Sequence, residues 1–217
     1  MVYLTRREVM VAAGREAEFE EWWLEGQEMG KSQKGFRLAT LGNSLGYPNK
    51  YAALIRFDTR EDWEASHRDP AFRARIERRP QGLIVGRPRP TEAYEQVHRV
   101  GLTGARPADA RPGFTTLVDW NVRGPAARAF ESSRKELFEL RQKHVQGLVV
   151  NALWKFLGNP SGYLVHATYT SREAAEQART HPEVEAYQRT HGYSEYASAP
   201  PVIENYRPVG RVQAERP

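Results

Sequence analysis

The sequence predicts an α+β fold made of two tandem ferredoxin-like βαββαβ repeats. Two observations predict it. The second half of the 217-residue chain matches the first at a constant shift of 112 residues, and both halves pass through the same order of strand and helix patterns. A shift that holds its register over many residues identifies an internal repeat.

The matches under this shift run without a gap from Gly35 to Val100. Gly35 falls on Gly147, and the turn at residues 45–48 falls on residues 157–160. Further pairs under the same shift are Tyr51 with Tyr163, Glu64 with Glu176, Pro70 with Pro182 and Tyr94 with Tyr206. The two halves therefore share one fold.

Each repeat is predicted to begin with a strand and a helix. Residues 114–122 alternate between two sets of side chains, as a strand does, and residues 2–11 are their counterpart. A glycine follows each strand, Gly14 or Gly124, and apolar residues then recur at helical spacing. Each of these helices should bury one face.

A hairpin comes next in each repeat, joined by a turn rich in Gly, Asn and Pro. The predicted strands are residues 36–41 with 51–57, and residues 148–156 with 163–169. The motif Gly42-Asn43-Ser44-Leu45-Gly46 has the spacing of a nucleophile elbow, but an elbow requires a strand followed by a helix. We therefore interpret Ser44 as a turn residue.

The second helix of each repeat is predicted to start after an N-cap, Thr59 or Ser171, and to break before Pro70 or Pro182. Each proline can start a further helical turn. The last strands are predicted at residues 91–97 and 202–206.

The predicted domains are two ferredoxin-like repeats, residues 1–100 and 114–212, with a Gly/Ala/Pro-rich linker at 101–113 and a tail at 213–217. A βαββαβ sheet carries its helices on one face and needs a cover on the other. The second repeat can supply that cover, so we expect an intramolecular, pseudo-dimeric α/β barrel. Independent repeats would leave both apolar faces exposed.

Composition excludes several classes of function. The chain has no cysteine, which excludes thiol nucleophiles and iron–sulfur clusters and favours a cytoplasmic protein. We expect no signal peptide and no membrane span, because no long apolar run occurs. Arginines alternate with glutamates despite the net charge of +5, so nucleic acid is not an expected partner. A homodimer formed through the sheet edges stays open.

The first repeat resembles the antibiotic biosynthesis monooxygenase (ABM) family over roughly 95 residues. The resemblance rests on residues 13–20, Gly35-Phe36, residues 57–63 and residues 69–72, and the second repeat shows it more faintly. It implies a dimeric α/β-barrel fold and a small-molecule ligand. The superfamily includes quinone-forming monooxygenases that use no metal or flavin, haem-degrading enzymes, and proteins of unknown role.

The haem-degrading branch uses a Trp and an axial His near the second helix, and this sequence departs from both. Ser66 and Ile76 occupy those positions in the first repeat, and Ala178 and Gln188 occupy them in the second, although His191 lies close by. Haem binding or degradation is therefore a minor alternative. No cofactor is predicted, and the spacing of the six histidines predicts no metal site.

The candidate catalytic residues are His166, Arg56 and Asn121. His166 has the strand parity opposite to Tyr163, so we expect it to face the space between the sheets, and Arg56 shares the parity of Leu54, the counterpart of His166. A histidine in a partly dry pocket can take a proton from a phenol, and an arginine can hold the anion. A structural histidine is the alternative interpretation.

The leading hypothesis is an ABM-like protein that binds a small apolar or aromatic molecule between its sheets and oxidises it with O₂ and no cofactor. The rival hypothesis is a non-catalytic binding or assembly module, in which duplication only internalises a dimer interface.

Overall fold

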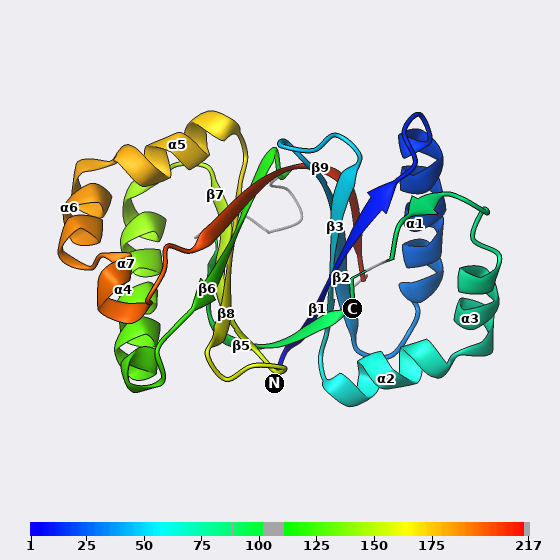
Figure 1. Cartoon of the computed structure of the whole chain (residues 1–217), viewed down its shortest axis with the longest axis horizontal. Coiled ribbons are helices and arrows are strands. Elements are labelled where there is room, and N and C mark those ends of the chain that lie inside the picture. Colours follow the sequence, from blue (N-terminus) through cyan, green and yellow to red (C-terminus); the bar gives the residue numbers. More distant parts are fainter. Residues whose placement is uncertain (88, 102–110, 215–217) are drawn as a thin grey trace. The chain divides into compact units, whose positions relative to one another are not determined.

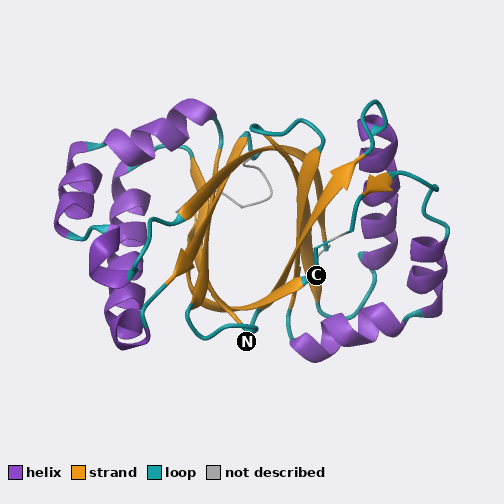
Figure 2. Ribbon diagram, in the orientation of Figure 1, coloured by secondary structure: helices purple, strands orange, loops and turns teal. Residues whose placement is uncertain are grey.

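The computed structural model describes residues 1–87, 89–101 and 111–214. Most of the predicted linker lies outside these residues. The chain divides into two compact units: unit 1 is Met1–Glu95 with Pro208–Pro217, and unit 2 is Gln96–Arg207. In each unit the helices lie on one face of that unit's own sheet (Figures 1 and 2).

Unit 1 follows the predicted order of strands and helices, with a short extra strand. Its elements are β1 (Tyr3–Val11), α1 (Glu16–Gly30), β2 (Phe36–Ser44), β3 (Lys50–Phe57), α2 (Arg60–Arg68), α3 (Pro70–Glu77), β4 (Ile84–Val85), the start of β5 (Glu92–Gly101) and the end of β9 (Val202–Gln213).

Unit 2 repeats this order and adds a short helix before its last strand. Its elements are the end of β5, β6 (Phe114–Asn121), the 3₁₀ turn η1 (Gly124–Ala126), α4 (Ala127–His144), β7 (Leu148–Phe156), β8 (Gly162–Tyr169), α5 (Arg172–Thr180), α6 (Pro182–Thr190), α7 (Tyr193–Tyr196) and the start of β9 (Val202–Gln213). Two βαββαβ repeats are therefore confirmed.

The predicted helix starts are confirmed in detail. The Thr59 hydroxyl accepts a hydrogen bond from the backbone of Asp62 at 3.1 Å, and the Ser171 hydroxyl accepts one from Ala174 at 3.2 Å. Each bond satisfies a backbone N–H that has no partner within the helix. Pro70 and Pro182 then start α3 and α6, where their missing N–H groups cost nothing.

The last strand of each repeat is longer than predicted, because it continues past the end of its own repeat's sheet. β5 pairs with β1 through Glu92–Glu95 and ends beside β7, and β9 pairs with β6 and ends beside β2. The unit boundaries fall inside these two strands. The continuation of β9 was not predicted from the sequence, because a proline within a run, here Pro208, argues against a strand.

The order of hydrogen-bonded strands is β3-β2-β9-β6-β8-β7-β5-β1-β4, and β3 also pairs with β1. The order therefore returns to its start after eight strands. Every one of these pairings lies within one unit, because β5 and β9 pass from one unit into the other.

A glycine at the start of the hairpin is required in both repeats. Gly35 has φ of 72° and Gly147 has φ of 81°, a region that side chains with a Cβ rarely adopt. A Cβ at Gly35 would lie 2.4 Å from the Asp62 carboxylate, and one at Gly147 would lie 2.4 Å from the Thr170 hydroxyl. Gly35 and Gly147, which match in the two repeats, are thus both required by the conformation of the backbone.

The core of each unit lies between its helices and its sheet. Trp23 is buried in the core of unit 1, and Trp22 and Trp63 pack against the same cluster. Ser44 ends β2, and its hydroxyl accepts hydrogen bonds from the backbone N–H groups of Gly46 and Tyr47 at 3.3 Å. Ser44 is therefore the last residue of the strand rather than a turn residue, and its segment leads into the second strand of a hairpin rather than into a helix.

Candidate functional site: a pocket in the helical layer of unit 2

The three residues predicted from the sequence lie in different places. His166 is buried on β8, and its Nε2 lies 3.0 Å from the Thr168 hydroxyl. Asn121 is exposed at the end of β6, four residue pairs from His166, or about 13 Å along the strands. Arg56 is half-buried on β3 in unit 1.

His166 and Asn121 face away from the helices of unit 2, which agrees with the parity argument. Tyr163 and Val165, on the other face of β8, belong to the core cluster under those helices. The role of His166, Arg56 and Asn121 in binding stays a prediction. The bond to Thr168 gives His166 the surroundings of a satisfied structural histidine.

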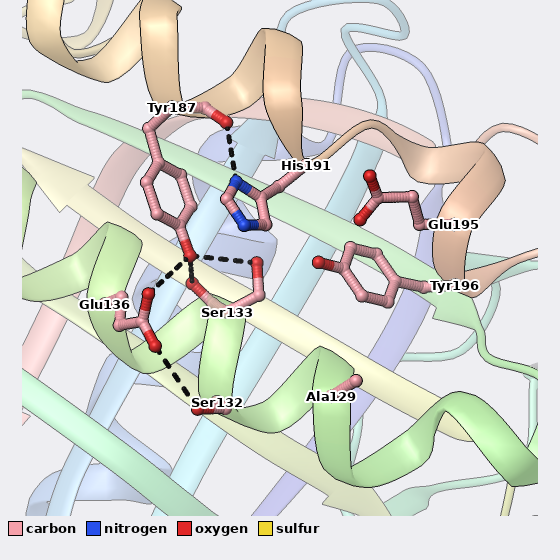
Figure 3. Close-up of a pocket in the computed structure, with 8 residues that line it drawn as sticks. All are labelled: Ala129, Ser132, Ser133, Glu136, Tyr187, His191, Glu195 and Tyr196. Carbon is pink, nitrogen blue, oxygen red and sulfur yellow. Dashed lines mark hydrogen bonds between the residues drawn. The ribbon is translucent and has the colours of Figure 1, made fainter.

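A pocket of about 610 Å³ lies elsewhere in unit 2, between α4 and the segment that contains α6 and α7 (Figure 3). Ser132, Ser133 and Glu136 line it from α4. Tyr187, His191, Glu195 and Tyr196 line it from the opposite side. Ser133 and Tyr196 are buried while Ser132, Glu136 and Glu195 are exposed, so the pocket has a buried floor and a charged rim.

His191 and Tyr187 form one side of the pocket. They are four residues apart at the end of α6, a spacing that places two side chains on one helical face. Their rings stack with centroids 4.2 Å apart and planes 12° apart. His191 Nδ1 lies 3.0 Å from the backbone carbonyl oxygen of Tyr187.

That carbonyl contact determines the state of the imidazole. Nδ1 also lies 3.0 Å from the Thr190 hydroxyl, which itself donates to the Tyr187 carbonyl oxygen at 2.9 Å. Neither that hydroxyl nor the carbonyl oxygen then donates to Nδ1, so Nδ1 carries the proton of the neutral ring and Nε2 keeps its lone pair. Within the described part of the chain Nε2 makes no hydrogen bond. Figure 3 shows the imidazole directed toward the hydroxyl groups of Tyr187 and Ser133. The pocket therefore contains a base whose acceptor nitrogen is available to a ligand.

The Tyr187 hydroxyl joins the two sides of the pocket. It lies 3.0 Å from the carboxylate of Glu136, 3.2 Å from the backbone oxygen of Ser133 and 3.3 Å from the Ser133 hydroxyl. Burial raises the pKa of Tyr187, and the Glu136 carboxylate adds to the increase. Tyr187 therefore stays a neutral donor at physiological pH.

A tyrosine–glutamate bond shows which positions of the two units correspond. Tyr51 donates to Glu20 at 2.8 Å in unit 1, and Tyr163 donates to Glu131 at 2.6 Å in unit 2. Because Glu20 and Glu131 correspond, Trp22 in α1 corresponds to Ser133 in α4. Unit 1 therefore has an indole where the pocket floor of unit 2 has a hydroxyl.

The corresponding place in unit 1 is occupied by Trp22 and Arg75. Arg75, the counterpart of Tyr187, donates to the backbone oxygen of Trp22 at 2.6 Å and to the carboxylate of Glu25 at 2.7 Å. Its guanidinium lies 5.6 Å from the center of the Trp22 ring. Tyr187 makes the equivalent bonds, but Ser133 fills much less space than Trp22 does.

Sequence reasoning missed this pocket, although it noted His191. The shift of 112 residues holds from Gly35 onward, whereas the first helices match at a shift of 111 residues. At that shift Trp22 aligns with Ser133, and the much smaller side chain of Ser133 indicates empty space beside α4.

Residues 1–87, 89–101 and 111–214 contain neither a metal-binding cluster nor a membrane-spanning helix. No group of three or more His, Asp or Glu side chains in these residues is arranged to hold a metal ion. No helix among them is long and apolar enough to span a membrane.

The fold and the pocket define a tandem α+β protein of the ferredoxin-like class. Residues 2–78 match the sequence model of the antibiotic biosynthesis monooxygenase family, so the first repeat is an ABM domain. No functionally curated protein matches the sequence significantly.

Solved structures with this fold cover nearly the whole chain. A candidate monooxygenase from Fusobacterium nucleatum has a TM-score of 0.81 at 10% identity, over 98% of this chain and 94% of that one. One from Lactobacillus acidophilus has a TM-score of 0.76 at 11% identity, over 98% and 96%. An anthrone oxidase-like protein has a TM-score of 0.69 at 13% identity, over 99% and 94%. These likenesses establish the fold.

Proposed function

We propose that the protein binds a small hydroxylated aromatic molecule in the pocket of unit 2 and oxidises it with O₂, without a metal or flavin. The observation that carries this proposal is His191, whose Nε2 faces the pocket without a hydrogen-bond partner in the described part of the chain. The ABM domain in the first repeat supports the class of chemistry.

The size and lining of the pocket suit such a ligand. A volume of about 610 Å³ lies within the usual range for small-molecule sites. The stacked rings of Tyr187 and His191 offer an aromatic wall, and the carboxylates of Glu136 and Glu195 at the rim can accept hydrogen bonds from hydroxyl groups.

The proposed reaction balances without an external reductant. His191 Nε2 takes the proton of a phenol, and the electron-rich phenolate ring reacts with O₂. A carbon–oxygen bond forms at a ring carbon that loses its hydrogen, the other oxygen atom leaves as water, and the product is a quinone. The substrate supplies all four electrons that O₂ accepts.

The test is oxygen uptake by the purified chain with a panel of naphthols and hydroxylated anthracenes. We compare the wild type with His191→Asn, because the shorter amide can still donate to the Tyr187 carbonyl but has no equivalent of Nε2. A general base contributes about 10²–10⁴-fold to a rate, so uptake should fall by that range while ligand binding persists.

His144→Asn is the matched control, because His144 lies at the end of α4 and does not line the pocket. It should leave oxygen uptake unchanged. Equal uptake by the wild type and His191→Asn would contradict the assignment of the base. Aromatic binding with no oxygen uptake would favour the binding module over the enzyme.

A further inference from the structure

Arg134 is a buried charge without a carboxylate partner. Its side chain lies behind the floor of the pocket, and the residue is 6% exposed. Nη2 donates to the Ser133 hydroxyl at 3.2 Å, and Nε is buried with no hydrogen-bond partner. Among the described residues no ion pair includes Arg134. A buried charge without a counter-ion is costly, so its presence needs a reason.

Aromatic rings offset part of that cost. The Arg134 guanidinium lies 5.2 Å from the ring centroid of Trp120, 5.4 Å from that of Phe130 and 5.8 Å from that of Tyr196. Burial, with repulsion from Arg141, lowers the pKa of Arg134 to about 10. The guanidinium is therefore still positive at neutral pH, and the rings hold it in place without neutralising it.

The other repeat shows that the fold does not need this charge. The counterpart of Arg134 in α1 is Trp23, which is buried in the apolar core of unit 1. An aromatic ring therefore suffices for packing at this position. The buried charge lies in unit 2, next to Ser133, the residue whose small side chain opens the pocket.

Ser133 links Arg134 to the pocket, because its hydroxyl contacts the guanidinium and its side chain lines the pocket. Its oxygen accepts from Arg134 and lies 3.3 Å from the Tyr187 hydroxyl, so neither contact uses the Ser133 proton. A ligand oxygen in the pocket can accept that proton in place of the neighbouring Tyr196 hydroxyl, which is also a hydrogen-bond partner of Ser133. Tyr196 lies beside it, and burial raises the pKa of that phenol. A hydroxyl polarised by a cation is a strong donor to an oxyanion.

The carboxylates around the pocket are more exposed than Arg134 is. The ionisable groups that face Arg134 or line the pocket, apart from His191, are Glu136, Arg141, Tyr187, Glu195 and Tyr196. Glu136 and Glu195, the two carboxylates among them, are exposed at the rim, where solvent weakens their repulsion of an anion. Arg134 is buried, so its field at the floor is screened less.

We propose that Arg134 is a positioning residue that makes the Ser133 hydroxyl an oxyanion donor, so that the pocket prefers acidic phenols and enols bound as anions. This inference rests on the proposed function, because it concerns the same pocket. It names the ligand class: an aromatic molecule with one ionisable hydroxyl for the floor and further hydroxyls for the rim carboxylates.

The test uses 4-nitrophenol, whose anion absorbs visible light, and its uncharged methyl ether, 4-nitroanisole. Absorbance titration gives the affinity for each probe and the pKa of the bound phenol. In the wild type that pKa should lie below its value in solution. In Arg134→Met the shift should disappear and phenolate affinity should fall about tenfold, as expected when a charge-assisted donor is lost, while 4-nitroanisole binds as before.

Ser133→Ala is the second variant, in case Arg134→Met does not fold. It leaves Arg134 in place but removes the donor, and it should abolish the same shift. Unchanged phenolate affinity and unchanged probe pKa in the folded variants would overturn the role of Arg134 and leave the proposed function intact. Failure of both probes to bind the wild type would overturn the proposed function together with this inference.

Discussion

Tyr187 and His191 stack at the end of α6 with their ring centroids 4.2 Å apart, and the backbone carbonyl of Tyr187 holds the proton on Nδ1 of His191. One helical turn thus fixes both the orientation and the tautomer of the imidazole before any ligand binds. A site that is organised in advance loses less entropy when it binds or reacts.

Ser133→Trp should close the pocket without unfolding unit 2. The substitution places in α4 the side chain that Trp22 already supplies at the matching position of α1, so the local backbone accommodates an indole there. We expect the thermal stabilisation of the wild type by a bound naphthol to disappear. The conservative control is Ser133→Thr, which should keep part of that stabilisation. Full stabilisation of Ser133→Trp would mean that the ligand binds elsewhere.

Val212→Ala should destabilise unit 1, although Val212 lies at the far end of the sequence. Val212 is 2% exposed and belongs to the core cluster of unit 1, because β9 ends beside β2. Loss of its buried methyl groups should lower the free energy of unfolding by about 1–2 kcal/mol. Chemical denaturation measures that change, and hydrogen exchange should accelerate in β2.

The matched control for Val212→Ala is Ile203→Ala, on the same strand. Ile203 is 60% exposed, so its truncation should leave the free energy of unfolding within about 0.5 kcal/mol. If the two substitutions had equal effects, or if hydrogen exchange accelerated in β6 rather than in β2, the pairing of the end of β9 with β2 would be contradicted.

His67 should make the protein less stable in mild acid. Burial lowers the pKa of His67 below its ordinary value, and the hydrogen bond to the Trp63 carbonyl only partly opposes this. As pH falls through about 6.5, the unfolded chain takes up a proton before the folded chain does, so stability is lost, with a limiting slope of about 1.4 kcal/mol per pH unit.

Urea denaturation between pH 8 and pH 5 checks this prediction. His67→Asn keeps a donor near the Trp63 carbonyl but has no ionisable ring, so its stability should fall less steeply over that range. Parallel curves for the wild type and His67→Asn would show that the folded-state pKa of His67 is not lowered.

The sequence was sufficient for the order of elements in both repeats because that order depends on local patterns. Alternation along residues 114–122, the caps at Thr59 and Ser171, and the required glycines at 35 and 147 act over a few residues. Each could be recognised without knowledge of distant contacts.

Local patterns could not reveal the pocket, nor could they reveal that the ends of β5 and β9 pair with strands of the other repeat. The end of β9 pairs with β2, far away in the sequence, and Pro208 interrupts its pattern. The pocket depends on a missing indole, and Ser133 has no local signature. In the last strand of each repeat a tyrosine donates to the glutamate two residues before it: Tyr94 to Glu92 at 2.8 Å and Tyr206 to Glu204 at 2.7 Å.

Strands β5 and β9 each belong partly to both units, and this imposes an order on folding during synthesis. β2 leaves the ribosome early, but the segment of β9 that pairs with it follows only after all of unit 2 has been made. Until then β2 presents an open edge to other nascent chains, and an open edge is a template for wrong pairing. The first repeat can complete its sheet only when the second repeat has delivered its final strand.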